Sequence, residues 1–491
     1  MSTVLSEQEL DPAAADYPAV ALFIDGAWVA GSSGRREPVY NPASGRVLGH
    51  VPHAGADDLQ RALEAAQRGF GEWSAWTVDA RAAVLHRAAA LIRERADVIA
   101  RTMTLEQGKP LSGARGEIMG STKLIDIYAE EAKRAYGRII PFERDVELSV
   151  IHEPAGPVAA FVPWNFPAGS PNRKIAAALA AGCSIVIKAS EETPATACEL
   201  VRCYAESGVP AGVLNLVFGV PAEISEQLIS SPITRLLAFT GSIPVGKHLA
   251  GLAAQQMLPA RMELGGHAPV LVCADADPLV AAARTAAAKF ANAGQVCTAP
   301  SRVLVHESLH DRFLEALVEE ARNLNVGDGL QDGVTMGPLA NPRRLEASAA
   351  FVSDARVRGA ELATGGSVIN RPGWFFEPTV LAGVPLDARI MLEEPFCPIA
   401  PVVTFTDLDE ALALANSLPY GLAAYAFTES AATATKLKHG LQAGIISINH
   451  CGGSVPEAPS GGVKQSGYGK EGGLEGLHDY LITKRVSHRL A

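Results

Sequence analysis

The sequence predicts an α/β fold in which short buried strands alternate with helices. Three runs have the length and apolar composition of fully buried strands: residues 158–162, 184–187 and 214–218. Three segments between and after them have helical spacing and length: residues 172–181, 194–207 and 222–230. Because strands and helices alternate along the chain, we expect parallel strands that are covered by helices.

The chain before the first of these strands divides into an acidic arm and a helical stretch. Residues 1–18 combine small residues with four carboxylates, which predicts a mobile arm. Between residues 57 and 101, apolar residues recur at helical spacing.

Further elements are expected downstream and between the two blocks. A second α/β run covers residues 270–427, with strands at 303–305 and 402–405. Residues 137–140 and 148–151 suggest an antiparallel hairpin, and residues 480–484 also have the composition of a strand.

Length, charge and cysteine usage narrow the class of protein. At 491 residues the chain is expected to form two to four domains, and 48% hydrophobic with 19% charged residues describes a globular enzyme. A net charge of −11 argues against nucleic acid and anionic membrane surfaces as partners. Seven single cysteines indicate neither a disulfide framework nor a zinc site. No signal region is expected, and the uncharged apolar stretch 175–187 is too short to span a bilayer, so a cytoplasmic protein is expected.

Three separate segments carry side chains suited to chemistry on a carbonyl group. Cys297 follows Gly294 in a short turn and is a candidate nucleophile. Glu263 lies in an otherwise apolar stretch next to two glycines and is a candidate general base. Asn165, in the segment 163–167, supplies an amide that could hold an oxyanion. Together they predict acyl-transfer chemistry.

These motifs resemble the aldehyde dehydrogenase superfamily of NAD(P)-dependent enzymes, and the resemblance extends from about residue 22 to residue 484. The matching segments, in order, are 163–167, 239–242, 263–266, 294–297 and 393–396. Finer detail at 263–269, 292–297 and 466–473 resembles the bacterial succinate-semialdehyde and α-ketoglutaric-semialdehyde dehydrogenases.

The resemblance implies an aldehyde dehydrogenase-like fold, with a Rossmann-type cofactor domain, an α/β catalytic domain and a β-strand oligomerisation module. The expected boundaries are 19–135 and 154–265 for the NAD-binding domain, 266–465 for the catalytic domain, and 136–153 and 466–491 for the module. The module extends a neighbouring subunit's sheet in that family, so a homodimer or homotetramer is expected.

The same resemblance implies a set of cofactor contacts. Gly241 and Ser242 would face the dinucleotide pyrophosphate, Lys188 and Glu191 the adenosine ribose, and Glu394 and Phe396 the nicotinamide end. The remaining implied contacts are Val162, Pro163, Trp164, Ser190, Phe239, Val245, Leu264 and Gly265. Glu191 would repel a 2′-phosphate, so NAD is favoured and NADP is possible. The alternative for Lys188 and Glu191 is a solvated charge pair at a strand end.

The implied reaction oxidises an aldehyde to its acid. Cys297 would form a thiohemiacetal and then a thioester, Asn165 would hold the oxyanion, and Glu263 would activate water. Lys174 and Glu471 match residues of a proton-relay path, and a structural ion pair is the alternative.

The implied substrate is a short carboxylated semialdehyde. Arg173 matches an arginine that binds a distal carboxylate, and Cys451 lies where the substrate channel is lined. Ala291 and Ser460 replace a second arginine and an aromatic residue, and Cys397 replaces a usual glycine. A broad-specificity aldehyde dehydrogenase for uncharged aliphatic or aromatic aldehydes is therefore the alternative.

Three short patterns point elsewhere. Residues 306–310 fit H-E-x-x-H, but a strand ends at Val305 and Ser308 resembles an N-cap, so no metal site is expected. Residues 467–472 fit G-x-G-x-x-G without a βαβ unit, which indicates a glycine-rich loop. Residues 241–248 differ by one residue from a P-loop, so a P-loop phosphotransferase is the alternative from a different class.

Overall fold

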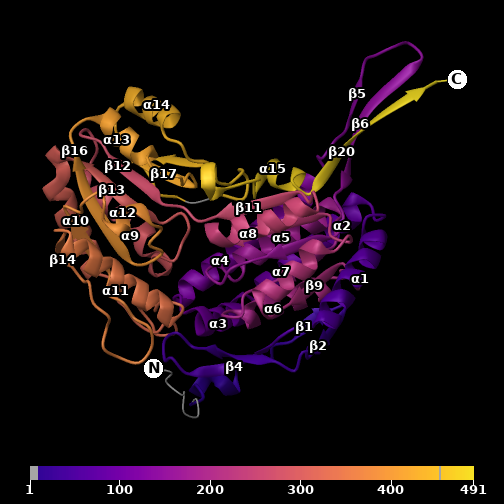
Figure 1. Ribbon diagram of the computed structural model, residues 1–491, viewed down its shortest axis with the longest axis horizontal. Coiled ribbons are helices and arrows are strands. Elements are labelled where there is room, and N and C mark those ends of the chain that lie inside the picture. The colour runs from indigo at the N-terminus through magenta and orange to yellow at the C-terminus, as the bar shows by residue number, and fades with distance from the viewer. Residues whose placement is uncertain (1–8, 453–454, 491) are drawn as a thin grey trace.

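The computed structural model describes residues 9–452 and 455–490, and it has two α/β halves with an arm of strands that projects from one of them (Figure 1). The first half contains an eight-stranded sheet in the order β19-β11-β10-β7-β8-β9-β1-β2. Its strands are β1 (Leu22–Ile24), β2 (Ala27–Val29), β7 (Val158–Phe161), β8 (Ile185–Lys188), β9 (Leu214–Val217), β10 (Leu236–Gly241), β11 (Ala260–Leu264) and β19 (Gly467–Tyr468). Strands β7 to β11 are parallel, and the antiparallel strands lie at the two edges of the sheet.

Helices cover both faces of this sheet, and a two-stranded hairpin packs beside it. The helices are α1 (Ala56–Trp73), α2 (Val78–Glu94), α3 (Ala96–Gln107), α4 (Leu111–Ala132), α5 (Gly169–Ala181), α6 (Pro194–Glu206), α7 (Pro221–Ser230), α8 (Ile243–Gln255) and α15 (Gly473–His478). The hairpin consists of β3 (Arg36–Tyr40) and β4 (Val47–Pro52).

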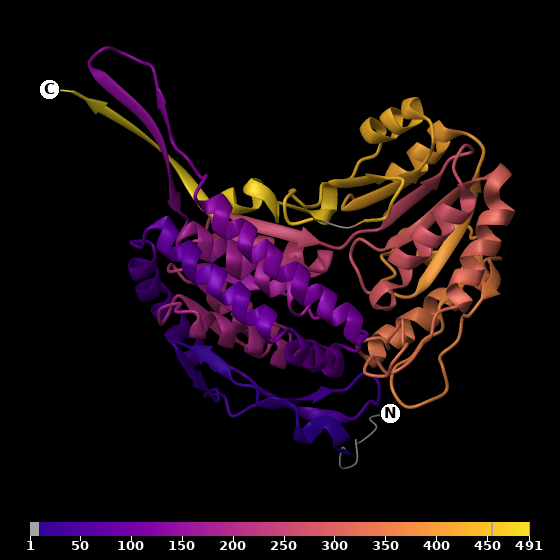
Figure 2. The same cartoon turned by 180° about the vertical axis from the view of Figure 1, so that it is seen from behind.

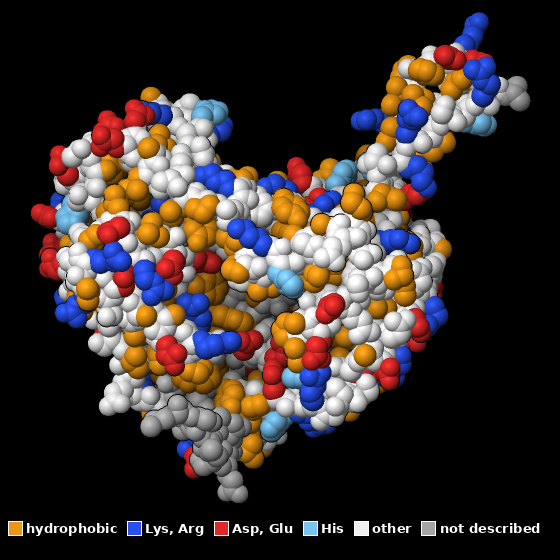
Figure 3. Space-filling model, viewed as in Figure 1, with side chains coloured by type: hydrophobic (Ala, Val, Ile, Leu, Met, Phe, Trp, Pro, Cys, Tyr) orange, Lys and Arg blue, Asp and Glu red, His pale blue; other side chains and the backbone are white. Residues whose placement is uncertain are grey.

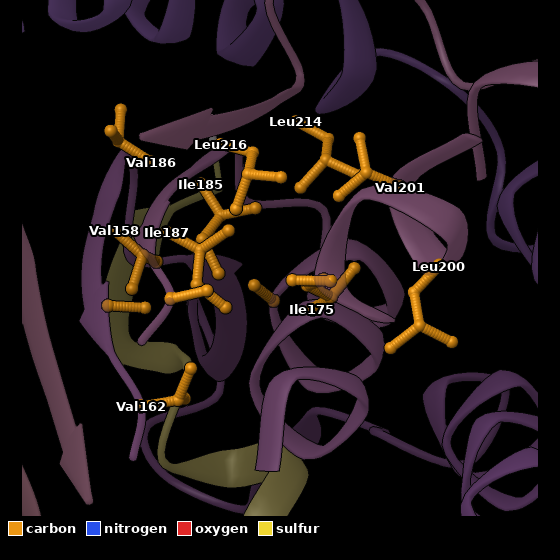
Figure 4. Packing of buried hydrophobic residues seen from close by; sticks show 14 of the residues in the cluster. Val158, Val162, Ile175, Ile185, Val186, Ile187, Leu200, Val201, Leu214 and Leu216 are labelled. Atoms are coloured by element: carbon orange, nitrogen blue, oxygen red, sulfur yellow. The ribbon is translucent and has the colours of Figure 1, made fainter. Parts of the chain in front are cut away.

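The core of the first half confirms the strands and helices expected at its centre. Every residue of β7, β8 and β9 is buried, as expected for a parallel sheet with both faces covered. Figure 4 shows Ile175 of α5 among side chains of β8 and β9, with Leu200 and Val201 of α6 nearby. Gly182, at φ +96°, ends α5 in the left-handed conformation that favours glycine.

The second half contains a seven-stranded sheet in the order β14-β15-β16-β13-β12-β17-β18. Its strands are β12 (Ala268–Val272), β13 (Pro300–His306), β14 (Glu361–Thr364), β15 (Thr379–Ala382), β16 (Ile399–Phe405), β17 (Ala423–Phe427) and β18 (Ile445–Ile448). Its helices are α9 (Pro278–Phe290), α10 (His310–Arg322), α11 (Pro342–Val357), α12 (Arg389–Leu392), α13 (Leu408–Asn416) and α14 (Ala431–Gly440). The chain passes from the first sheet to the second between β11 and β12, close to the expected boundary at residue 265.

The projecting arm is a three-stranded antiparallel sheet in the order β20-β6-β5. Its strands are β5 (Arg138–Ile140), β6 (Val146–Pro154) and β20 (Leu481–Arg489), which confirms the expected hairpin and the C-terminal strand. Both views of the chain show the arm extending away from the two halves (Figures 1 and 2).

The structure corrects three expectations. Within the expected mobile arm, residues 10–17 are attached to the first half: Asp11 accepts hydrogen bonds from Asn41 Nδ2 at 3.0 Å and Ser44 Oγ at 2.6 Å, and Tyr17 Oη donates to Glu106 Oε2 at 2.6 Å. Residues 1–8 lie outside the described part. Residues 467–478, assigned to the module, form β19 and α15 on the first half instead. The N-cap of α10 is Leu309 rather than Ser308, because a 3₁₀ turn at Glu307–Leu309 precedes the helix.

No helix within residues 9–452 and 455–490 is both long enough and apolar enough to cross a membrane.

Candidate active site

A cavity of about 820 Å³ lies at the junction of the two halves, where Figure 3 shows the surface hollowed. Its lining combines side chains that are far apart in the sequence. The candidate site residues that line it are Pro163, Trp164, Asn165, Arg173, Gly241, Ser242, Glu263, Leu264, Gly265, Cys297, Glu394, Phe396, Cys451 and Glu471. The remaining candidates lie outside this lining: Val162, Lys174, Lys188, Ser190, Glu191, Phe239 and Val245.

Most candidate cofactor residues lie where the parallel strands of the first sheet have their carboxyl ends. Val162 follows β7, Lys188 ends β8, and Leu264 ends β11, so these positions meet at the carboxyl ends of parallel strands. The Val162 N–H donates to the Lys188 carbonyl at 3.1 Å. Open α/β sheets bind ligands at this edge.

The segment before Cys297 has an uncommon backbone conformation. Asn292, Ala293 and Gly294 are successive left-handed residues, with φ of 50°, 53° and 72°. A Cβ on Gly294 would lie 2.1 Å from the Cys397 carbonyl oxygen, so this position requires glycine. Left-handed non-glycine residues store strain that the surroundings must hold in place.

Hydrogen bonds from the first half hold this segment. Gln107 Nε2 donates to Asn292 Oδ1 at 2.9 Å, and Asn292 Nδ2 donates to the Asn165 carbonyl at 3.0 Å. Asn165 Nδ2 donates to the Gln295 carbonyl at 3.1 Å. The candidate amide donor and the candidate nucleophile are therefore fixed relative to each other.

The surroundings of Cys297 and Glu263 favour their neutral forms. Burial, followed by the charges of Glu394 and Glu263, raises the pKa of the Cys297 thiol to about 12. Burial, followed by the charge of Glu471, raises the pKa of Glu263 well above its usual range, although Lys174 opposes the shift. Glu263 Oε1 is buried and has no hydrogen-bond partner among the described residues. This oxygen can therefore accept a proton once Glu263 is ionised.

Lys174 and Glu471 form an ion pair beside Glu263. Lys174 Nζ lies 2.7 Å from Glu471 Oε1 and donates to Thr240 Oγ1, also at 2.7 Å. Arg173 Nη1 lies 3.7 Å from the other carboxylate oxygen of Glu471. The charge of Arg173, the candidate anion partner, is thus shared with Glu471.

Two further residues of the site escape sequence reasoning. Lys109 donates to the Asn165 carbonyl at 3.0 Å and forms a buried ion pair with Glu117. Glu117 Oε1 accepts the N–H groups of Ala168 and Gly169, both at 2.9 Å, at the start of α5. Neither residue belongs to a recognisable motif, because the backbone groups of Asn165 and Ala168 that they contact lie more than fifty positions away along the chain.

The cavity has features that suit a dinucleotide. Ser242 lines the cavity as the N-cap of α8, and its side chain makes no capping bond that would occupy the first N–H groups of this helix, which suit an anion. A Cβ on Gly241 would lie 2.4 Å from the Phe239 ring, and one on Gly265 would lie 2.2 Å from Glu394 Oε2. Only glycine therefore fits at these two positions without displacing Phe239 or Glu394. The helix N-terminus at the carboxyl ends of parallel strands suits a bound NAD or NADP.

The nicotinamide end of the expected site is also ordered. Glu394 Oε1 accepts the Gly266 N–H at 3.1 Å, and the Trp164 and Phe396 rings meet edge to face with centroids 5.7 Å apart. Phe396 has a left-handed backbone with φ of 47°. Cys397, the next residue, is fully buried, and Cys451, which is part-exposed, also lines the cavity.

Lys188 and Glu191 form an ion pair at the expected ribose position. The pair is mostly buried, with the two side chains 8% and 12% exposed, which contradicts the alternative of a solvated pair. Glu191 Oε1 also accepts the Gly219 N–H at 2.8 Å.

The misleading motifs have structural explanations. Lys247, which a P-loop would direct at phosphates, is exposed and donates to Gln465 at 2.9 Å. His306 ends β13 and His310 begins α10, so the two histidines do not share a helix face.

Comparison with known proteins agrees with this site. The aldehyde dehydrogenase family matches residues 28–486. A 4-(hydroxymethyl)benzenesulfonate dehydrogenase of Comamonas testosteroni is 46% identical over 469 residues, which cover 95% of this chain and 98% of that protein. The succinate-semialdehyde dehydrogenase [NADP(+)] of Escherichia coli strain K12 is 42% identical over 94% of this chain and 96% of its own length.

A solved structure gives the same result for the fold. The crystal structure of succinate-semialdehyde dehydrogenase from Burkholderia pseudomallei matches with a TM-score of 0.95 at 39% identity, covering 99% of this chain and 100% of that one. The chain therefore belongs to the aldehyde dehydrogenase family, and it is an oxidoreductase that acts on aldehydes with NAD or NADP.

Proposed function

We propose that this enzyme oxidises an aldehyde with a distal anionic group to the corresponding acid, with NAD as the preferred acceptor. The observation that carries the proposal is the single cavity in which Cys297, Asn165, Glu263 and Arg173 meet. It supplies a nucleophile, an oxyanion donor, a base and a cation along one path.

In the first step Cys297 loses its proton and its sulfur attacks the aldehyde carbon, giving a thiohemiacetal. Because the resting thiol has a pKa of about 12, it needs a base, and the unpartnered Oε1 of Glu263 suits this role. The Asn165 amide and the Cys297 N–H hold the oxyanion, and losing one such donor costs on the order of 10²–10³ in rate. When bound, NAD or NADP accepts the hydride that leaves this carbon.

In the second step water releases the acid from the Cys297 thioester. Glu263 takes a proton from that water. Lys174 and Glu471 lie next to Glu263, and we propose that they carry the proton onward from it.

The distal anion is the finer part of the proposal. Arg173 is a cationic side chain on the cavity wall, and it is 29% exposed. The two relatives named above act, by their names, on a sulfonate and on a semialdehyde of a dicarboxylic acid. A carboxylate or a sulfonate offers an arginine the same pair of acceptor oxygens.

Matched aldehydes test the distal anion. Succinate semialdehyde should be preferred over butyraldehyde, and 4-carboxybenzaldehyde over benzaldehyde, by roughly 10–150-fold in kcat/KM, the range of a charge-assisted hydrogen bond. Arg173→Ala should remove most of both preferences and leave the uncharged aldehydes nearly unchanged. Equal turnover of charged and uncharged aldehydes by the unaltered enzyme would contradict the proposal.

A broad-specificity enzyme for uncharged aldehydes is the second candidate. It is favoured by Ala291 and Ser460, two small residues in the cavity lining, and by the partial neutralisation of Arg173 by Glu471. The same panel separates the two candidates.

For the cofactor, we propose a preference for NAD. Glu191 keeps a carboxylate at the carboxyl end of β8, where an added 2′-phosphate would meet like charge. The Escherichia coli relative carries NADP(+) in its name, so the preference depends on this chain's own side chains.

For assembly, we propose a homodimer or homotetramer built through the arm. Ile139, Ile482 and Val486 are exposed on the arm, at 73%, 47% and 38%. Apolar side chains on a projecting sheet suit burial against another subunit. Sedimentation should give a dimer or tetramer for the unaltered chain, and Ile139→Asp with Ile482→Asp should shift it towards the monomer.

A further inference from the structure

The hairpin β3–β4 brings a second carboxylate to the carboxyl end of β9. Glu37 lies on β3 and pairs in register with Val51 of β4. His53 follows this hairpin, and its Nε2 lies 3.4 Å from Glu37 Oε2. The Ala54 N–H donates to the Phe218 carbonyl at 2.8 Å, which attaches the end of the hairpin to the carboxyl end of β9.

Glu37 and Glu191 are connected through this junction. Gly219, next to Phe218, donates its N–H to Glu191 Oε1. A Cβ on Gly219 would lie 3.2 Å from His53 Cβ and 3.4 Å from its Cα, so the backbone of His53 packs directly against the strand end that holds Glu191. The order in space is therefore Glu37, His53, Gly219 and Glu191.

Two of the three carboxylates at this junction have a cationic partner, whereas among the described residues Glu37 has only His53 beside it. Lys188 pairs with Glu191, and Arg343 pairs with the neighbouring Glu192 at 3.1 Å. Burial, followed by the charge of Glu191, raises the pKa of Glu37, although His53 opposes the shift. His53 is only 7% exposed, and both of its ring nitrogens are buried without a hydrogen-bond partner among residues 9–452 and 455–490. The carboxylate of Glu37 therefore lacks a hydrogen bond from this ring.

We infer that Glu37 forms a second acidic wall of the ribose pocket and acts together with Glu191 to disfavour a cofactor with a 2′-phosphate. The inference rests on the proposed position of the ribose beside Glu191. A free ribose hydroxyl beside Glu191 adds no charge, whereas a 2′-phosphate adds up to two negative charges that both carboxylates repel. Removing the Glu191 carboxylate alone would then leave part of the discrimination in place.

Adenosine 5′-monophosphate, with and without a 2′-phosphate, tests this directly by isothermal titration of the full-length enzyme. In Glu37→Gln, affinity for the 2′-phosphorylated ligand should rise about 3- to 10-fold, the effect of one part-exposed charge, while affinity for the plain monophosphate stays within about twofold. Glu37→Asp keeps the charge and should keep the discrimination. Glu64→Gln, an exposed carboxylate on α1, is the matched control and should change neither affinity.

Glu191→Ser separates this inference from the proposed ribose pocket. If Glu191→Ser improves binding of the 2′-phosphorylated ligand and Glu37→Gln does not, the second wall is wrong and the pocket stands. If neither variant changes it, the pocket itself lies elsewhere and both ideas fail. Equal weakening of both ligands in Glu37→Gln would make Glu37 a structural residue. The double variant, Glu37→Gln with Glu191→Ser, should discriminate between the two ligands less than either single variant does. The kcat/KM ratio of NADP to NAD should rise from the unaltered enzyme through the single variants to the double variant.

Discussion

Lys174 and Glu471 form a direct ion pair of 2.7 Å across 297 positions of sequence, and the pair lies beside Glu263. The carboxylate of Glu471 is held ionised there by Lys174 and Arg173, which keep its pKa below the usual range in spite of burial. Burial is the main cause of the raised pKa of Glu263, and the negative charge of Glu471 adds to it while Lys174 opposes it. The ion pair thus contributes to the protonation of the candidate base.

Glu471→Gln should move the acidic limb of the pH–rate profile to lower pH. Removing the negative charge lowers the pKa of Glu263, so the base ionises earlier as pH rises. The measurement is kcat against pH with a saturating aldehyde. Glu429→Gln, on the exposed surface of the second half, should leave the limb in place. If the acidic limb does not move in Glu471→Gln, that limb reports the titration of a group other than Glu263.

Cys297→Ala should reduce turnover by at least about 10³-fold, since the covalent step has no other nucleophile at that position. Binding of NAD, followed by tryptophan fluorescence, should persist because most of the expected dinucleotide contacts lie on the first half, away from the thiol. Cys203→Ala, which alters a core thiol of α6, is the control and should retain turnover. Substantial dehydrogenase activity in Cys297→Ala would contradict the mechanism.

Glu263→Gln should slow thioester hydrolysis more than thioester formation. Water is a weaker nucleophile than a thiol and depends more on the carboxylate. Stopped-flow absorbance of NADH should then give a burst followed by a weak steady state. Loss of the burst together with turnover would assign Glu263 mainly to thiol activation.

Gly294→Ala should inactivate the enzyme and destabilise it by about 1–3 kcal/mol, because alanine is strained at φ +72° and its Cβ would meet the Cys397 carbonyl. Gly251→Ala is the matched control. Gly251 lies within α8 with open space around it, so alanine should stabilise the helix by up to about 1 kcal/mol. Thermal unfolding and a turnover assay on both variants check the pair. An active Gly294→Ala enzyme would show that the loop tolerates a different conformation.

Local patterns in the sequence were enough to predict the buried strands β7, β8 and β9, because short apolar runs of that length are typical of buried strands. They also identified Cys297 and Glu263, which lie in short motifs. Gln107 and Lys109 could not be found in this way, because their roles depend on contacts with Asn292 and Asn165 in distant segments.

Some local conformations also lie beyond pattern reasoning. The left-handed backbone of Ala293 contradicts the preference of its own residue type and exists only because neighbouring hydrogen bonds hold the loop. The packing of Asp11 depends on Asn41 and Ser44, which composition alone does not reveal.

The hydrogen bonds that cross from the first half to the Cys297 loop limit how the molecule can move. Gln107 and Asn165 belong to one half, and Asn292 and Gln295 to the other, so a wide hinge opening would break these bonds and withdraw the thiol. We therefore expect the dinucleotide to enter and leave by sliding along a cleft that remains closed around the nucleophile. Exchange of spent cofactor would then require only side-chain and loop rearrangements, without separation of the two halves.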